Sequence, residues 1–513
     1  MTVKVTTVGL KGMDGYRVSV EVKVMHGPES VVIVGLPDAS VKESKERVAA
    51  ALRSCRYEVP DQKVIVNLSP AEQKKNGPMF DLAVAIGLLG AMGAIKEEIK
   101  EDTGFIGALS LDGNVQPVEG MLPAVLAARK IGLKKLYLPY DPNLPAIDFE
   151  NIELIYVTSL QDVLDHLAGQ SIFSFVSSKK ESSFREAASP VRFEQIVGHS
   201  YPKRAMEIAA AGGHHFFMIG PPGCGKSMLA ESFTSILPAL SSQERLEVIS
   251  LHHLSGVPLS TQHSRPLRAP HHSASSVSII GGGQYPKPGE ISLAHHGVLF
   301  LDEMAEFSKK TLDMLRQPIE TGTVTISRAN ATVNYPSQFT LIGAMNPCPC
   351  GYLGSDKYYC TCSPKQISAY QNRLSGPIRD RLDIFLDIQP VNFHTTMPVG
   401  DTSDMVLTRV IEARRRQYNR YGNQVLNSLV SYDTLQSASP LSSSQQQLLR
   451  QISSKQHLSN RTQVKIIRLA RTISDLENSE TITEQSIWEA LKLQNGKQKM
   501  NHTKKSEKIT HLL

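Results

Sequence analysis

The clearest chemistry in the sequence lies in a glycine-rich stretch between an apolar run and a helical run. The stretch fits the phosphate-binding pattern G-x-x-x-x-G-K-[ST] in the strand-then-helix setting that this pattern requires. It consists of Gly220, Pro221, Pro222, Gly223, Cys224, Gly225, Lys226 and Ser227. Lys226 can reach the β- and γ-phosphates of a nucleotide, and Ser227 can ligate Mg²⁺. A plain turn would not need Lys and Ser at its end, so the stretch predicts ATP binding with Mg²⁺.

Two carboxylates follow a second apolar run, and an amide side chain follows a third. Residues 297–301 read as a buried strand that leads into Asp302 and Glu303. Residues 340–345 lead in the same way into Asn346. Asp302 would hold Mg²⁺, directly or through water, and Glu303 would polarise an attacking water. Strands often end in an acidic residue without a catalytic reason, but the phosphate loop upstream favours ATP hydrolysis.

Four of the six cysteines fall in one short segment, as two C-x-C pairs. They are Cys348, Cys350, Cys360 and Cys362. Four thiolates suit tetrahedral Zn²⁺, although the spacing within each pair is tighter than zinc sites usually have. A set of buried free thiols is the alternative. Because disulfides are rare in a reducing compartment, we predict a zinc site in preference to disulfides.

Eight of the 16 histidines stand in adjacent pairs. The pairs are His214-His215, His252-His253, His271-His272 and His295-His296. Neighbouring residues of a strand point to opposite faces, so the two members of a pair would not bind one metal ion together. We therefore expect these histidines to serve packing and hydrogen bonding rather than metal binding.

Length and composition indicate a globular protein of several domains. The chain has 513 residues, too many for one hydrophobic core, with 41% hydrophobic and 20% charged residues. A net charge of +6 is too small to argue for nucleic acid by itself. No apolar run reaches the length of a membrane span and the N-terminus has no signal-peptide core, so we expect a cytoplasmic protein without a membrane partner.

The remaining pattern divides the chain into five parts. Residues 1–168 alternate strand-like and helical runs and predict an α/β domain, and the Ser-rich residues 169–190 predict a linker. A second α/β domain is expected over 191–392, a helical domain over 393–495, and a basic disordered tail over 496–513. In the first domain we expect strands at 17–23, 31–34, 64–68, 135–138 and 154–157, and helices at 39–54, 80–90 and 122–131.

The first domain resembles the protease-like domain of the Lon family. The likeness rests on Asn76-Gly77-Pro78 before a helix and on the run from 107 to 120, Gly-Ala-Leu-Ser-Leu-Asp-Gly-Asn-Val-Gln-Pro-Val-Glu-Gly. Active members of that family use a Ser–Lys pair in which the Lys activates the Ser. Here Met79 to Asp81 follow where the family places its Ser, and Leu122 stands at the Lys position. We therefore predict a structural or assembly role and no peptidase activity.

With the motif Ser375-Gly-Pro-Ile-Arg-Asp-Arg-Leu-Asp383, residues 1–495 resemble AAA+ ATPases of the magnesium-chelatase subfamily, most closely the ComM/YifB group. The resemblance implies a Lon-protease-like N-domain, an AAA+ core with a parallel sheet and a helical C-terminal lid domain. It also implies Asn346 as sensor 1, Arg381 as an arginine finger for a neighbouring subunit, and Arg461 as sensor 2. A finger in trans implies a ring of identical subunits, a hexamer. Arg379 stands where an apolar residue is expected, so the finger is either Arg379 or Arg381.

Two excursions and one helix carry basic residues that suit nucleic acid. In the subfamily, insertions like residues 265–293 and the hairpin at 323–335 face the ring pore, where Lys287 and Arg328 would contact DNA phosphates. Residues 403–421 form a helix with a cluster around Arg414, interleaved with tyrosines. Solvated loops and a solvated helix face are the alternatives.

The resemblance implies an ATP-driven ring motor that acts on single-stranded or branched DNA. Such a helicase or branch-migration enzyme would support recombination during natural transformation. A magnesium-chelatase-like ATPase that remodels a partner protein is a second candidate, and a nucleotide-dependent protease or regulatory scaffold is a third. The N-terminal domain argues against the second, and the missing Ser–Lys pair argues against a protease.

Overall fold

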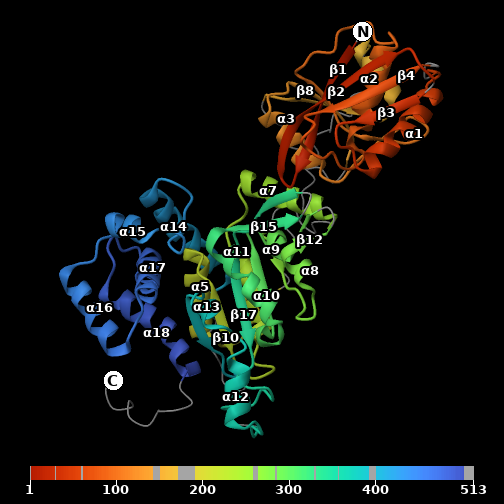
Figure 1. Ribbon diagram of the computed structural model, residues 1–513. Coiled ribbons are helices and arrows are strands. Elements are labelled where there is room, and N and C mark those ends of the chain that lie inside the picture. Colours follow the sequence, from red (N-terminus) through yellow and green to blue (C-terminus); the bar gives the residue numbers. More distant parts are fainter. Residues whose placement is uncertain are drawn as a thin grey trace.

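The computed structural model describes residues 2–28, 30–58, 62–141, 151–170, 191–257, 264–283, 286–328, 331–355, 358–391 and 400–501. An N-terminal α/β unit, a central parallel sheet and a group of C-terminal helices follow one another from red to blue in Figure 1. The mixed α/β class and the helical C-terminal region agree with the sequence-based prediction. From residue 171 on, the predicted linker lies outside the described residues. Among the helices in these ranges, none is long and apolar enough to cross a membrane.

A seven-stranded mixed sheet, in the order β3-β4-β2-β1-β5-β8-β9, forms the centre of the N-terminal unit. Strand β2 is antiparallel to both of its neighbours, and the other neighbouring strands are parallel. The strands are β1 (Thr2–Lys11), β2 (Asp14–Met25), β3 (Ser30–Val34), β4 (Lys63–Ser69), β5 (Thr103–Phe105), β8 (Lys135–Pro139) and β9 (Glu153–Val157). Strand β1 was not predicted, because residues 5–9 are buried on both faces and lack the alternation of a half-exposed strand.

Four helices accompany this sheet, and three of them lie where the sequence predicts helices. They are α1 (Ala39–Ser54), α2 (Asp81–Ala91), α3 (Met121–Lys130) and α4 (Leu160–Leu167). Asp38 begins α1 because its carboxylate accepts the Val41 N–H at 2.8 Å. Helix α2 is buried from Asp81 to Leu89, as its unbroken apolar sequence requires. The short strands β6 (Ala108–Leu109) and β7 (Val115–Gln116) pair across the turn between them.

The central sheet has five parallel strands in the order β11-β14-β17-β10-β18. They are β10 (Phe216–Ile219), β11 (Leu267–Arg268), β14 (Val298–Leu301), β17 (Thr340–Met345) and β18 (Ile384–Asp387). Parallel strands covered on both faces read as continuous apolar runs, which is why the sequence revealed β10, β14 and β17. Because the strands run the same way, their carboxyl ends share one edge of the sheet and their amino ends share the other.

Alternate side chains of these strands enter two different cores. Phe216 and Met218 lie on the face packed with α5 (Ser200–Gly212) and the C-terminal helices. Phe217 and Leu299 lie on the opposite face, which the segments between the strands cover. These segments contain α7 (Ser242–Ser255), α8 (Ser276–Ile280), β12 (Gly281–Gly282), β13 (Lys287–Pro288), α9 (Glu290–Leu293), α10 (Lys309–Met314), α11 (Arg316–Thr321), β15 (Thr323–Arg328) and β16 (Ala331–Pro336).

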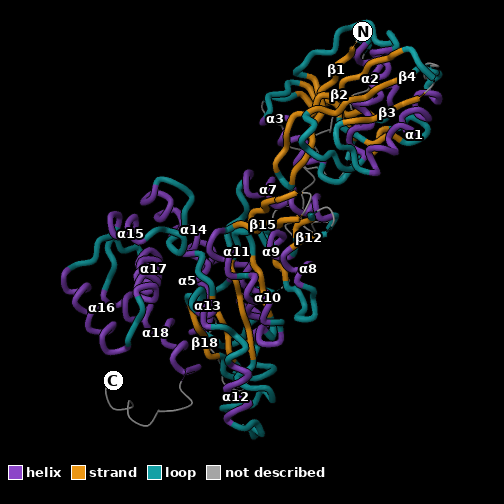
Figure 2. The backbone as a smooth tube through the Cα atoms, in the orientation of Figure 1, coloured by secondary structure: helices purple, strands orange, loops and turns teal. Residues whose placement is uncertain are grey.

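From Ser403 to Asn501 the chain consists of helices and the loops that join them, as the tube in Figure 2 shows. The helices are α14 (Ser403–Tyr421), α15 (Tyr432–Ala438), α16 (Ser443–Gln456), α17 (Asn460–Leu476) and α18 (Glu484–Asn501). Their buried residues share one core with the central sheet, through α5 and β18. Helix α18 continues to Asn501, past the start of the predicted basic tail.

Helix α7 joins the N-terminal unit to the central sheet. Its Leu246 and Ile249 belong to the core of the N-terminal unit. In the other direction, Met13 from the turn between β1 and β2 packs against the core beneath the central sheet. Glu119 of the N-terminal unit pairs with Lys287 of β13 at 2.7 Å. The two parts therefore meet directly, around a cavity of about 780 Å³.

Candidate active site

The phosphate-binding loop lies at the carboxyl end of β10 and leads into α6 (Lys226–Ser232). Gly223 and Gly225 have φ of +75° and +91°, a backbone conformation that other residues rarely adopt. The turn therefore depends on glycine at these two positions, and a side chain there would also fill space that a phosphate needs.

Residues that follow three neighbouring strands meet at this edge of the sheet. The Lys226 ammonium after β10 donates to the Asn346 side-chain oxygen after β17 at 3.1 Å. It also donates to the carbonyl oxygens of Gly220 and Pro221 at 2.8 and 3.0 Å. These oxygens carry no net charge, so the lysine charge stays available for a phosphate.

The loop also contacts the acidic residues after β14. The Ser227 hydroxyl donates to an Asp302 carboxylate oxygen at 3.0 Å. A hydroxyl and a carboxylate in contact are the oxygen ligands that Mg²⁺ takes in nucleotide sites, so this pair fits the ion that the sequence predicts. The structure thus brings four of the predicted residues together, namely Lys226, Ser227, Asp302 and Asn346.

Glu303 occupies an unusual backbone conformation next to Asp302. Its φ and ψ are +46° and +45°, the left-handed region that non-glycine residues rarely occupy, and its N–H donates to Asp302 Oδ1 at 2.8 Å. Its Oε2 lies 3.4 Å from His272 Nδ1. The sequence predicted packing and hydrogen bonding for the pair His271-His272, but it gave no signal that His272 lies beside Glu303.

Arg381 and Arg461 meet at the opposite edge of the sheet. Both guanidinium groups contact one oxygen of Glu320, at 2.7 Å from Arg381 and 2.5 Å from Arg461. The hydrogen bond from Arg461, followed by that from Arg381, lowers the pKa of the Glu320 carboxyl. The three side chains border a cavity of about 360 Å³ together with His215, which precedes β10. A strand of four residues spans about 13 Å, so neither arginine is brought to the phosphate loop of its own chain.

A buried ion pair supports this second edge. Asp383 precedes β18, and its carboxylate lies 3.2 Å from Lys465 Nζ of α17. Burial by itself would raise the pKa of Asp383, but Lys465 and the nearby His214 outweigh it, and the pKa lies well below its usual range. Helix α17, which carries Arg461, is thereby fixed to the start of β18.

Arg379 has a different environment from Arg381. It is buried, burial lowers its pKa, and its guanidinium donates to the carbonyl of Gln371 in α12 (Pro364–Gln371). Arg381 instead borders the cavity of about 360 Å³, which Glu320 of α11 also lines. Its guanidinium donates to the Arg316 carbonyl of the same helix at 3.3 Å. Of the two candidates for the finger, Arg381 lines the cavity of about 360 Å³, whereas Arg379 is buried.

The predicted DNA-contacting residues lie on two neighbouring hairpins. The Arg328 guanidinium lies against Gly282, so β15–β16 and β12–β13 are side by side. Lys287 is paired with Glu119 of the N-terminal unit, through side chains that are 49% and 63% exposed. An exposed pair of this kind is weak and leaves Lys287 able to exchange partners.

The sequence left DNA contact and a solvated helix face open for the residues around Arg414, and Arg414 itself fits neither. Arg414 is buried, donates to the Ala210 carbonyl at 2.7 Å, and has its pKa lowered to about 10 by burial. Arg416 donates to the Asp475 carbonyl at 2.7 Å. Helix α14 packs against α5 and α17, so its arginines on that side hold helices together. Arg415 is exposed and pairs with a glutamate of its own helix.

The histidine pairs show where reasoning from strand geometry failed. The rings of His295 and His296 lie 3.8 Å apart, and both contact one oxygen of Glu247, because His296 has a φ of +57° and does not continue a strand. His295 Nδ1 accepts the Gln338 N–H at 3.0 Å, so its proton is on Nε2 and is donated to Glu247. That nitrogen has no lone pair for a metal, and the predicted role in hydrogen bonding fits.

The residues at the catalytic positions of the peptidase family are different in the N-terminal unit. Met79 and Leu122, at the positions of the Ser and the Lys, are both buried. Asp81 is buried as well, and it accepts hydrogen bonds from the Ser44 hydroxyl and the Arg47 guanidinium. Its carboxylate is thus held in a structural ion pair.

A third cavity, of about 480 Å³, lies between the start of the central unit and α14. The cavity is lined by Ile196, Val197, Gly198 and Lys203, among others. The Lys203 ammonium donates to the Ile196 carbonyl oxygen at 2.6 Å. His199, which follows Gly198, reaches Gly225 of the phosphate loop. The sequence offered only the short Ile-Val-Gly run before α5 as a signal for this cavity.

Three family models match the chain in succession. Subunit ChlI of Mg-chelatase matches residues 20–142, magnesium chelatase subunit ChlI matches residues 192–396, and the C-terminal model of that subunit matches residues 400–494. The second model belongs to a family of AAA+ ATPase type and contains all the residues that meet at the phosphate loop.

Similarity to whole proteins extends over nearly the full chain. The Competence protein ComM of Haemophilus influenzae is 37% identical over 488 residues, which cover 94% of this chain and 95% of that protein. YifB of Escherichia coli is 37% identical over 492 residues, covering 94% of each chain. Lon protease 2 of Bacillus subtilis is 34% identical over 128 residues, 25% of this chain and 22% of that protein. The chain belongs to the ComM/YifB family of magnesium-chelatase-like proteins.

Proposed function

We propose that this protein is an ATP-hydrolysing motor that assembles into a hexameric ring and moves single-stranded or branched DNA. The meeting of Lys226, Ser227, Asp302 and Asn346 at one edge of the sheet carries this proposal. Bound ATP with Mg²⁺ would supply the phosphoanhydride bond and the cation that offsets its charge. The proposed metals are Mg²⁺ at Ser227 and Asp302 and Zn²⁺ at the four clustered cysteines.

The residues at this edge of the sheet have different roles in the proposed hydrolysis. Lys226 exchanges its carbonyl partners for the β- and γ-phosphates, and the loop glycines allow backbone N–H groups to face them. Glu303 accepts a hydrogen bond from the attacking water and polarises it, while Asn346 fixes the position of the γ-phosphate as sensor 1. For Glu303 to reach the water, its contact with His272 must open.

The arginines at the other edge support a ring. In the proposed assembly Arg381, as finger, and Arg461, as sensor 2, point from one subunit into the nucleotide site of its neighbour. Hydrolysis is then possible only between assembled subunits, because the charge of the transferred phosphate is stabilised across the interface.

The name of one relative and the positions of two basic residues support an action on DNA. A relative of near-equal length is named a competence protein, and we infer a role in recombination during natural transformation. Arg328 and Lys287 lie on adjacent hairpins that leave the central sheet, where they would contact phosphates of DNA in the pore. A remodelling motor for a partner protein is the competing function, favoured by the family's magnesium-chelatase models.

The deciding experiment measures ATP hydrolysis with and without single-stranded and forked DNA, for the wild type and Lys226→Ala. We expect DNA to stimulate the wild type several-fold and Lys226→Ala to be inactive throughout. Movement of a labelled branched DNA should require ATP and intact Lys226. Hydrolysis that depends on Lys226 but ignores DNA would contradict the DNA motor and favour the remodelling function. Arg328→Ala serves as the variant that should lose stimulation and keep basal hydrolysis.

A further inference from the structure

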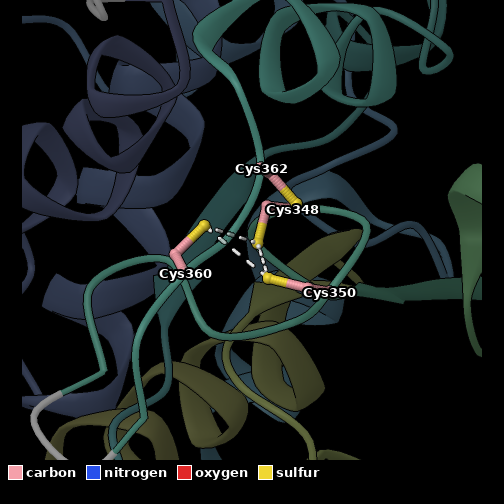
Figure 3. A group of neighbouring side chains, drawn as sticks. All are labelled: Cys348, Cys350, Cys360 and Cys362. Carbon is pink, nitrogen blue, oxygen red and sulfur yellow. Dashed lines mark hydrogen bonds between the residues drawn. The ribbon is translucent and has the colours of Figure 1, made fainter.

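Four cysteines converge between β17 and α12. Cys348 and Cys350 follow Asn346, and Cys360 and Cys362 precede α12. Figure 3 shows their side chains gathered at one point, and the four sulfur atoms all lie within 4.8 Å of one another. Two segments separated along the loop therefore contribute two thiols each to one cluster.

The sulfur separations fit one tetrahedral ion. The Cys348 sulfur lies 3.3 Å from that of Cys350 and 3.7 Å from that of Cys360, and the Cys350 and Cys360 sulfurs are 3.6 Å apart. A disulfide would need about 2.05 Å. Four sulfurs at about 2.3 Å from a central Zn²⁺ stand about 3.8 Å from one another. The cluster is therefore too open for disulfides and has the size of a single zinc site.

The surrounding backbone suits thiolates. The Leu353 N–H donates to the Cys348 sulfur at 3.3 Å, and Cys348 itself is buried. Hydrogen bonds of this kind stabilise the negative charge on metal-bound sulfur and orient it. The turn that supplies them contains Gly351, whose φ of +85° lets the chain reverse between the two ligands and the donor.

The same loop touches the nucleotide edge at two points. A Cβ atom on Gly351 would come within 2.8 Å of the Pro222 ring in the phosphate loop, so the two backbones are in close contact. The Gln371 side chain of α12 donates to the Pro347 carbonyl at 3.0 Å, directly after Asn346. The cysteine loop thus packs on the phosphate loop and continues from the proposed sensor residue.

We propose that Cys348, Cys350, Cys360 and Cys362 hold one Zn²⁺ ion that clamps the loop after β17 onto the phosphate loop and keeps Asn346 facing the nucleotide. The clamp function rests on the proposed role of Asn346 in ATP hydrolysis. Without the ion, only weak contacts between thiols hold the two halves of the loop together. The loop then no longer fixes the orientation of Asn346 relative to Lys226.

The first test is metal analysis of the full-length protein. We expect about one zinc atom per chain, and a thiolate–cobalt absorption spectrum of tetrahedral type after exchange with Co²⁺. Cys360→Ser should lose the ion, whereas Cys55→Ser, at a free cysteine of the N-terminal unit, should keep it. Absence of zinc from the wild type, iron in its place, or full zinc in Cys360→Ser would overturn the proposal.

The second test separates the clamp from general stability. In Cys360→Ser we expect kcat for ATP hydrolysis to fall roughly ten-fold with little change in KM, because Asn346 acts after ATP is bound. Cys360→His, which preserves a zinc ligand, should restore zinc and most of kcat. If the zinc-bound and the zinc-free protein had equal kcat values, the proposed clamp would be overturned. If the wild type binds zinc and Cys360→Ser loses kcat as expected, but DNA does not change the rate of ATP hydrolysis, the zinc clamp is supported and the DNA motor is contradicted.

Discussion

Asp81 joins three elements of the N-terminal unit through its carboxylate. Its buried carboxylate accepts from the Arg47 guanidinium at 2.7 Å, from the Leu109 N–H at 3.2 Å and from the Ser44 hydroxyl. These bonds link α1, α2 and the short strand β6. The hydrogen bond to Asp81 is also the main reason why the pKa of Arg47 is raised.

We expect Asp81→Ala to destabilise the N-terminal unit by about 3 kcal/mol, because the buried Ser44 hydroxyl, the Leu109 N–H and the partly exposed Arg47 guanidinium lose their shared acceptor. Urea unfolding followed by circular dichroism measures this loss. Glu43→Gln is the matched control, since Glu43 contacts the same arginine at 3.9 Å from an exposed position and should cost less than about 0.5 kcal/mol. Equal losses in the two variants would contradict a structural role for Asp81.

His272 restrains the residue that we assign to water activation. Its ring lies 3.4 Å from Glu303, with side chains 34% and 51% exposed, and it packs edge-on against Phe307. A partly exposed pair contributes at most about 1 kcal/mol, which corresponds to about five-fold in rate. We expect His272→Ala to raise DNA-independent ATP hydrolysis by up to this factor, measured at saturating ATP. The double variant with Glu303→Gln should be inactive, and a slower His272→Ala would show that His272 assists Glu303 instead.

At the scale of elements, α7 connects the N-terminal unit to the strand that ends in Asp302. One side of the helix enters the N-terminal core, and Glu247 on the other side contacts His295 and His296 before β14. The bonds from His295 and then His296 hold the pKa of Glu247 well below its usual range. Burial lowers the pKa of His295. Both groups bind protons more readily in the unfolded chain, so the stability of this connection falls as pH falls.

We expect the unfolding midpoint of the wild type to decline as pH drops through about 6.5, where unfolded histidine takes up a proton, and to decline further below about 4.3, where unfolded glutamate does. Glu247→Gln should make the decline below about 4.3 shallower, because it removes one of the carboxylates that contribute to it, while Glu412→Gln on the exposed face of α14 should leave the decline unchanged. Thermal unfolding at a series of pH values measures both. Parallel curves for Glu247→Gln and the wild type would contradict this account.

At the scale of the whole molecule, the two edges of the central sheet carry different groups of the predicted residues. The phosphate loop and Asp302 lie at one edge, while Arg381 and Arg461 share Glu320 at the other. A subunit alone holds these groups apart, and a ring of subunits would join the edge of one to the edge of the next.

Mixing two inactive variants tests this arrangement. Lys226→Ala and Arg381→Ala should each abolish hydrolysis, and an equal mixture should regain about a quarter of wild-type activity, because that share of random interfaces pairs an intact Lys226 with an intact Arg381. Subunits must be exchanged before the assay, and Arg379→Ala mixed with Lys226→Ala is the parallel test of the other arginine. If Arg381 acted within its own chain, the mixture would stay inactive.

The sequence by itself determined the chemistry of the phosphate edge. The loop from Gly220 to Ser227 is contiguous, so its glycines and its lysine are recognisable without knowledge of the fold. The apolar runs before Asp302 and Asn346 identify parallel strands, and the carboxyl ends of parallel strands must share an edge. These predictions need only local patterns and one rule of sheet geometry.

Only the tertiary structure decided where the charged residues of the helices and turns point. Arg414 looked like part of a basic surface, yet it is buried against α5 because the helix packs on that side. His295 and His296 converge on one carboxylate because a left-handed residue breaks the strand pattern. Arg381 and Arg461 are far apart in sequence and meet only because α17 packs on the amino edge of the sheet. Contacts between distant segments depend on how elements pack, and a local pattern does not encode that.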